Sequence, residues 1–195
     1  RSRYHYATEE TADKMRKIAQ LGLIPGEPAA SRGRDLVFII GMPRSGTTLT
    51  EQILGAHSLG RGIGETDHFG MYFRRQEKKS GVAFPEILTR IRDSARIRVA
   101  GEFEDFFRSG QSDRQVLIEK TPNNFAYLGL LQGWFPEAKF VHTVRDSRDV
   151  CFSIWSRLFP SAGHFYGYDA KELAEYYCLY QEQMEHWKKT LPIPI

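Results

Sequence analysis

Two glycines separated by four residues, Gly41 and Gly46, bound the segment of this chain with the clearest chemical signature. The segment reads Gly41-Met-Pro-Arg-Ser-Gly-Thr-Thr48 and follows the apolar run Leu36-Val-Phe-Ile-Ile40. Such a run is typical of a strand buried on both faces. Glycines let a backbone wrap around an anion, and the N–H groups at the start of the next helix supply positive potential. The spacing is that of a phosphate-binding loop, in which Arg44 supplies a cation.

The loop has Thr47 where nucleotide kinases and GTPases carry the Lys that holds the terminal phosphates together with Mg²⁺. A sulfuryl group carries less charge than a phosphoryl group, so positioned hydrogen bonds and one or two cations can transfer it without a metal. A P-loop kinase or NTPase stays an alternative, because Asp146 is placed like the acid that holds Mg²⁺ in those enzymes. A non-catalytic nucleotide-binding module is a second alternative.

Further polar residues follow other predicted strands and turns. Glu65 ends a glycine-rich turn that begins at Gly60, and Lys120 directly follows the predicted strand Val116–Glu119. Arg145 follows the predicted strand Lys139–Val144, and Ser153 lies eight residues later on the next predicted helix. Ligands of parallel sheets bind beyond the carboxyl ends of the strands, so we expect these side chains to face one crevice. Taken singly, Glu65 also suits a helix start and Lys120 suits a surface loop.

The string Pro43-Arg-Ser-Gly-Thr-Thr-Leu49 resembles the 5′-phosphosulfate loop of sulfotransferases that use 3′-phosphoadenosine 5′-phosphosulfate (PAPS). The longer string from Val37 to Leu54 is similar to tetratricopeptide-linked bacterial sulfotransferases and to tyrosylprotein sulfotransferases. The resemblance extends over about Leu36–Leu158. It implies that PAPS is the co-substrate and PAP the product, with no metal required. It also implies that the 5′-phosphosulfate is held by Arg44, Ser45, Gly46, Thr47, Thr48 and Leu49.

The same resemblance implies roles for the other polar residues. Glu65 corresponds to the general base, although those relatives have two acidic residues where this chain has Gly64 and Glu65. Lys120 lies in a Lys-x-Pro setting and would assist the leaving phosphate together with Arg44. Arg145 and Ser153 would hold the 3′-phosphate. The acceptor hydroxyl can belong to a protein tyrosine, a carbohydrate or a small molecule.

Composition narrows the remaining function classes. The chain has 195 residues, 41% of them hydrophobic and 26% charged, which suits one globular domain. Its net charge of +3 permits an anionic ligand. We interpret Arg90, Arg92, Arg96 and Arg98 as a solvated helix face and expect no nucleic-acid binding. No apolar run approaches the roughly 20 residues of a membrane span. The two cysteines, Cys151 and Cys178, are interpreted as reduced core thiols, and we expect a cytoplasmic protein.

The elements that position these residues alternate between strands and helices. Alternation of this kind predicts an α/β protein of P-loop type, with three layers and a mostly parallel sheet flanked by helices. We expect residues 1–33 to form an N-terminal helix and linker, and residues 34–195 to form a sulfotransferase P-loop domain shortened at its C-terminus. A fourth strand is expected at Ile193–Ile195. Helices are expected at Arg3–Leu21, Thr47–His57, His68–Lys79, Pro85–Ser109, Asn124–Trp134, Ser147–Leu158 and Ala170–Thr190.

Overall fold

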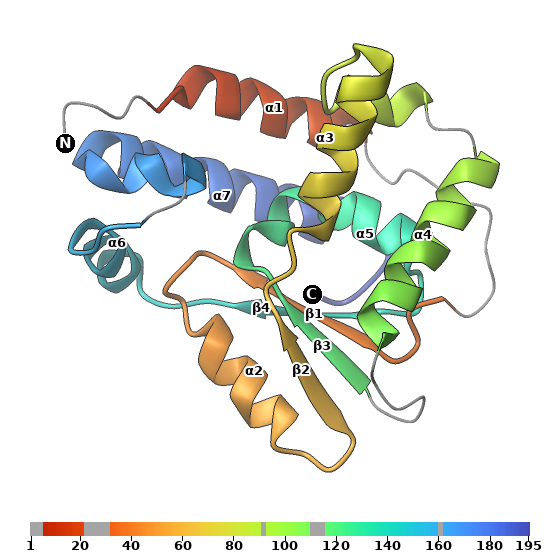
Figure 1. Cartoon of the computed structure of the whole chain (residues 1–195). Helices are drawn as coiled ribbons and strands as arrows, with labels where there is room; N and C mark the ends of the chain where they lie inside the picture. The colour runs from red at the N-terminus through yellow and green to blue at the C-terminus, as the bar shows by residue number, and fades with distance from the viewer. Residues whose placement is uncertain (1–5, 22–31, 91–92, 110–115, 160–161) are drawn as a thin grey trace.

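A parallel sheet lies at the centre of the protein (Figure 1). The computed structural model describes residues 6–21, 32–90, 93–109, 116–159 and 162–195, without the side chains of residues 93–96 and 162–163. The strands are β1 (Leu36–Gly41), β2 (Gly60–Gly64), β3 (Val116–Lys120) and β4 (Lys139–Thr143), in the order β2-β3-β1-β4. Every pairing is parallel, so all these strands end at the same edge of the sheet. The expected α/β fold with a parallel sheet is confirmed.

Helices lie on both sides of this sheet. Figure 1 shows α1, α3, α5 and α7 on one side and α2 on the other. Short 3₁₀ helices connect some elements: η1 (Glu86–Arg90), η2 (Pro122–Tyr127) and η3 (Ala162–Tyr168). The α-helices are α1 (Thr8–Leu21), α2 (Thr47–Gly55), α3 (His68–Ser80), α4 (Asp93–Arg108), α5 (Leu128–Trp134), α6 (Ser147–Trp155) and α7 (Ala170–Thr190).

The main apolar core lies between the sheet and the layer of helices that contains α1 and α7. Leu36, Phe38 and Ile40 of β1 alternate along the strand and belong to this core. The ring of Phe38 stacks on that of Phe140 from β4, with a centroid separation of 5.5 Å. α1 packs against α7 and buries its apolar stripe, which includes Met15, in the same core. The packing on this side fixes the strands whose ends carry the candidate site.

The fourth strand of the sheet is not the one that the sequence predicts. Gly60–Gly64, expected as a turn, forms β2, one of the two edge strands of the described sheet. Three glycines in five residues hide the strand, since glycine weakens strands and gives no alternating pattern. Ile193–Ile195 is not a strand. The backbone N–H of Leu191 donates to the carbonyl of Trp187 and closes α7 before that segment.

Two predicted helices are interrupted, and some predictions fall outside the described residues. The segment expected as one helix from Pro85 to Ser109 contains η1 and then α4, and the segment before Trp134 contains η2 and then α5. The bounds of α7 agree with the prediction. Residues 3–5 of the first predicted helix, residues 22–31 of the predicted linker, and the side chains of Arg92 and Arg96 are not described. Within the described ranges, no helix is both long enough and apolar enough to cross a membrane.

Candidate active site

The loop after β1 has the backbone of an anion-binding turn. Arg44 and Gly46 both have positive φ, of 70° and 105°, and Gly46 leads directly into α2. The first N–H groups of a helix lack partners within the helix, so they are available to a ligand. Gly41 has a φ of 147°, and a Cβ there would lie 2.6 Å from the carbonyl oxygen of Thr143. The close approach of β1 and β4 therefore requires glycine at this position.

The side chains of the loop point in different directions. The hydroxyl oxygens of Ser45 and Thr143 lie 2.7 Å apart, which ties the loop to the end of β4. Thr47 is buried, whereas Arg44, Thr48 and Leu49 are exposed. The exposed cation and the helix start are the parts of the loop that can meet an anion.

The two predicted phosphate-binding regions are in direct contact. Nε of Arg44 donates to Oγ of Ser153 at 3.0 Å, and this joins the loop after β1 to α6. The described hydrogen bonds of the Arg145 guanidinium go to Oδ2 of Asp149, at 3.1 and 3.3 Å, and not to Ser153. The sequence correctly predicts that these groups lie at one edge. It does not predict that Asp149, one turn further along α6, holds Arg145.

The acid that supports the kinase alternative is already paired. Asp146 accepts from the backbone N–H of Arg148 at 2.9 Å and caps the start of α6. The guanidinium of Arg148 also donates to both carboxylate oxygens. These bonds lower the pKa of Asp146 to about 2. Asp146 therefore acts as a helix cap in this structure.

Glu65 and Lys120 meet at the ends of β2 and β3. Nζ of Lys120 donates to Oε1 of Glu65 at 2.5 Å. The Lys120 side chain is 8% exposed, and the Glu65 side chain is 61% exposed. The ammonium is thus fixed in the protein, whereas the carboxylate also faces solvent. A proton acceptor and a cation lie side by side at the edge where the anion loop begins.

A buried acid next to this pair is a residue that sequence reasoning missed. Glu119 ends the apolar part of β3, and its side chain lies inside the protein. Burial raises the pKa of Glu119 to about 7. Hydrogen bonds from Thr121 and Thr66 act in the opposite direction but are the smaller effect. The available signal was an acidic residue closing the run Val116-Leu-Ile-Glu119, where a buried strand would continue with apolar residues.

A second missed residue supports β2 from α2. Oε1 of Glu51 accepts from the backbone N–H of Gly64 at 2.8 Å. A Cβ on Gly62 would lie 2.9 Å from the same oxygen. Glu51 therefore explains both the end of β2 and one of its glycines. Its helical position in the sequence does not distinguish it from an ordinary solvated acid.

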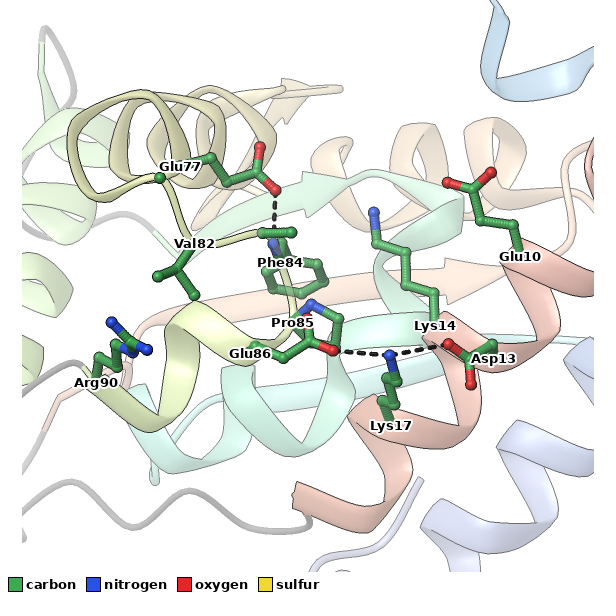
Figure 2. A pocket seen from close by; sticks show the side chains of 12 residues that line it. Glu10, Asp13, Lys14, Lys17, Glu77, Val82, Phe84, Pro85, Glu86 and Arg90 are labelled. Carbon is green, nitrogen blue, oxygen red and sulfur yellow. Dashed lines mark hydrogen bonds and ion pairs between the residues drawn. The ribbon is translucent and has the colours of Figure 1, made fainter.

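A separate hollow lies between α1 and the segment that follows α3 (Figure 2). It has a volume of about 660 Å³, and none of the predicted site residues lines it. Lys17 pairs there with Asp13 at 3.0 Å and with Glu86 at 2.8 Å. Nζ of Lys14 lies 5.0 Å from the centre of the Phe84 ring. The charges of Lys17, Asp13 and Glu86, which Figure 2 joins by dashed lines, satisfy one another.

Comparison with known proteins identifies the family. Residues 36–195 match the sulfotransferase family. The chain belongs to this family. The resemblance carried by the anion loop is therefore confirmed, and the parallel sheet agrees with the P-loop-type fold of sulfotransferases.

Several relatives of this sulfotransferase-family chain are known. It is 33% identical over 168 residues to an uncharacterized protein of Aquifex aeolicus (strain VF5), a match that covers 80% of this chain and 22% of that protein. It is 29% identical over 161 residues to protein-tyrosine sulfotransferase A of Caenorhabditis elegans. This match covers 80% of this chain and 42% of that protein. It is 33% identical over 135 residues to protein-tyrosine sulfotransferase 1 of Homo sapiens. This match covers 66% of this chain and 36% of that protein. The chain spans less than half the length of each of these relatives.

Proposed function

We propose that this chain transfers a sulfuryl group from PAPS to an acceptor hydroxyl. The observation that carries the proposal is the contact between Lys120 and Glu65 at the edge where the anion loop follows β1. Membership of the sulfotransferase family supports it. A cation for the leaving group and a base for the acceptor are the two functions that such a transfer needs beside the phosphate-binding groups.

PAPS would bind along the carboxyl edge of the sheet. In this proposal the loop Arg44, Ser45, Gly46, Thr47, Thr48 and Leu49 holds the 5′-phosphosulfate, and Arg145 and Ser153 hold the 3′-phosphate. The bond from Arg44 to Ser153 supports this arrangement, because it joins the residues assigned to the two ends of one nucleotide. Arg145 would exchange its pairing with Asp149 for the phosphate, which a guanidinium can bind through two parallel hydrogen bonds.

The chemical step is an in-line displacement at sulfur. The acceptor oxygen forms a bond to sulfur while the bond from sulfur to the bridging phosphate oxygen breaks. Glu65 takes the proton of the acceptor hydroxyl, and the electron pair of the broken bond stays on the phosphate of PAP. Lys120 and Arg44 stabilise that developing negative charge, and a fixed cation does so without reorganising. The residues named here carry out this step without a metal ion.

A protein tyrosine is the first acceptor to test. Two of the relatives above are named protein-tyrosine sulfotransferases, and this chain covers under half of each. Carbohydrate and small-molecule hydroxyls belong in the same panel. Glu65 is exposed, so an acceptor can reach it from solvent.

Transfer of labelled sulfate from PAPS to this panel, with calorimetry of nucleotide binding, tests the proposal. We expect label transfer and tighter binding of PAP than of ADP or ATP, without a need for Mg²⁺. Tighter Mg²⁺-dependent binding of ATP would favour the kinase or NTPase alternative. Binding of PAP without transfer to any acceptor would favour a non-catalytic nucleotide-binding module.

A further inference from the structure

Glu119 is a buried acid for which the transfer chemistry has no direct use. Its side chain is 1% exposed, in the interior beside β2 and η2. A buried carboxyl group costs free energy unless its oxygens are hydrogen-bonded. Here both oxygens accept hydrogen bonds, and the donors lie beside the proposed reacting residues.

The hydrogen bonds form a small network across the strand ends. Oε1 of Glu119 accepts from the hydroxyl of Thr66 at 3.1 Å and from the hydroxyl of Thr121. Oε2 accepts from the side-chain amide of Asn124 at 3.0 Å. The hydroxyl oxygen of Thr121 also accepts from the backbone N–H of Thr66 at 3.1 Å. One carboxyl group thus joins β3, the start of η2 and the segment that leaves β2.

The partners of Glu119 are the direct neighbours of the proposed acid–base pair. Thr66 follows Glu65 in the chain, and Thr121 follows Lys120. The pairing of β2 with β3 is irregular between Gly62 and Gly64, and it ends with Gly64 opposite Glu119. The sheet ladder therefore stops before Glu65. After Gly64, Thr66 is joined to β3 and to Thr121 by the described hydrogen bonds of this network.

We propose that Glu119 is a positioning residue, which fixes Glu65 against Lys120 by holding Thr66 and Thr121 on the same carboxyl group. Glu119 does not touch a reactant in this proposal. Its loss should therefore lower kcat while donor binding stays, because the anion loop lies on β1 and α2. The inference rests on the proposed function for its kinetic effect, but its structural effect can be measured separately.

The test compares Glu119→Leu with Glu119→Gln in the full chain. Leucine removes every acceptor, and we expect kcat to fall about a hundred-fold, the size of effect that a displacement of about 1 Å can produce. Glutamine keeps an amide oxygen for the two threonines, and Asn124 can turn its own oxygen toward the new amide. We expect this variant to recover kcat to within about tenfold of the native value. The PAP dissociation constant should change by less than about threefold in both.

A matched control separates positioning from general loss of stability. Gln183 is another buried polar side chain, on α7, and its Nε2 has no hydrogen-bond partner among the described residues. Gln183→Leu should leave kcat unchanged. Equal losses of kcat in Gln183→Leu and Glu119→Leu, or native kcat in Glu119→Leu, would overturn the inference. If Glu119→Leu fails to fold, Thr121→Val removes one hydroxyl of the network, and a kcat about tenfold lower is expected.

Crystal structures of the variants keep this inference distinct from the proposed function. The distance from Lys120 Nζ to Glu65 Oε1, 2.5 Å in the native chain, should be kept in Glu119→Gln and in Gln183→Leu. It should exceed 4 Å in Glu119→Leu. A native distance in Glu119→Leu contradicts the positioning role, whatever the kinetics. A native enzyme that transfers no label contradicts the proposed function alone, and the structures then decide the role of Glu119.

Discussion

Arg44 is the residue that joins the loop after β1 to helix α6. Its guanidinium bonds Ser153, and its backbone has the positive φ that side chains other than glycine rarely adopt. A strained position that also carries a cation is common where a backbone must wrap a ligand. The sequence indicates the cation and the loop, but neither the strain nor the contact with Ser153 can be inferred from spacing.

Arg44→Ala should weaken PAP binding about ten- to a hundred-fold, because a hydrogen bond to a charged group contributes about 1.5–3 kcal/mol. Ser153→Ala should weaken it less. The double variant should lose less than the sum, since the two side chains share a contact. Calorimetry with PAP measures all three.

Arg34→Ala is the matched control for charge. Arg34 precedes β1 at the opposite edge of the sheet and pairs with Glu137 at 2.9 Å. Its loss removes one positive charge and should leave PAP binding unchanged. Equal weakening by both arginine variants would mean that Arg44 contributes only to the overall charge.

Glu65→Gln should lower kcat by about a hundred- to ten-thousand-fold, the usual contribution of a general base. PAP binding should stay close to native. Label transfer at saturating PAPS measures the effect. Asp67→Asn is the control, because that carboxylate lies two residues away and pairs with Arg74. If the losses were reversed between these two variants, Asp67 would be the base.

At the scale of elements, the strands with apolar sequences and the long helix α7 are predictable, whereas β2 is not. The apolar residues of β1, β3 and β4 predict strands, and the sequence places Lys120 and Arg145 correctly at the ends of β3 and β4. β2 has no such run, because two of its glycines leave room for the Glu51 side chain and for the last residues of α2. Its strand character comes from pairing with β3, which is a tertiary effect.

Gly41→Ala should lower the free energy of unfolding by about 1–3 kcal/mol, because a Cβ would strike the carbonyl of Thr143 and φ is positive. It should also weaken PAP binding, since the anion loop starts there. Urea unfolding and calorimetry measure the two effects. Gly55→Ala is the control, since its Cβ would meet only ordinary contacts. An equal loss of stability in Gly55→Ala would exclude this steric explanation.

At the scale of the whole molecule, the fold class and the edge that carries the site follow from the sequence. The network behind the site does not, because Glu119 gains its neighbours only when β2 and β3 pair. The burial of the cysteines also does not follow from the sequence. Both are free, but Cys178 is exposed rather than in the core.

The stability of the molecule should depend on the buried Glu119 and the half-buried His142, which titrate in opposite senses. Burial raises the pKa of Glu119 from 4.5 to about 7, so its contribution is present below pH 4.5 and is lost as the pH rises to 7. Burial, with a smaller effect of Lys188, lowers the pKa of His142 from 6.5 to about 4. Its contribution is present above pH 6.5 and is lost as the pH falls to 4.

The two slopes oppose each other between pH 4.5 and 6.5, and each can be removed by one substitution. The free energy of unfolding of Glu119→Gln should rise more steeply with pH than that of the native chain. The difference that accumulates between the two curves should be about 3 kcal/mol at most. The free energy of unfolding of His142→Gln should fall more steeply. Urea unfolding across this range measures both. Parallel curves for Glu119→Gln and the native chain would mean that Glu119 does not titrate near neutral pH.

The packing of α1 on α7 also affects how this molecule is made. α1 precedes every strand of the described sheet, and α7 follows them all. A ribosome therefore releases the stripe of Ala12, Met15 and Ile18 long before the surface that covers it. Domains fold as units during synthesis, so this core closes only after α7 has left the exit tunnel. The nascent chain thus passes through most of its translation with the apolar stripe of α1 uncovered.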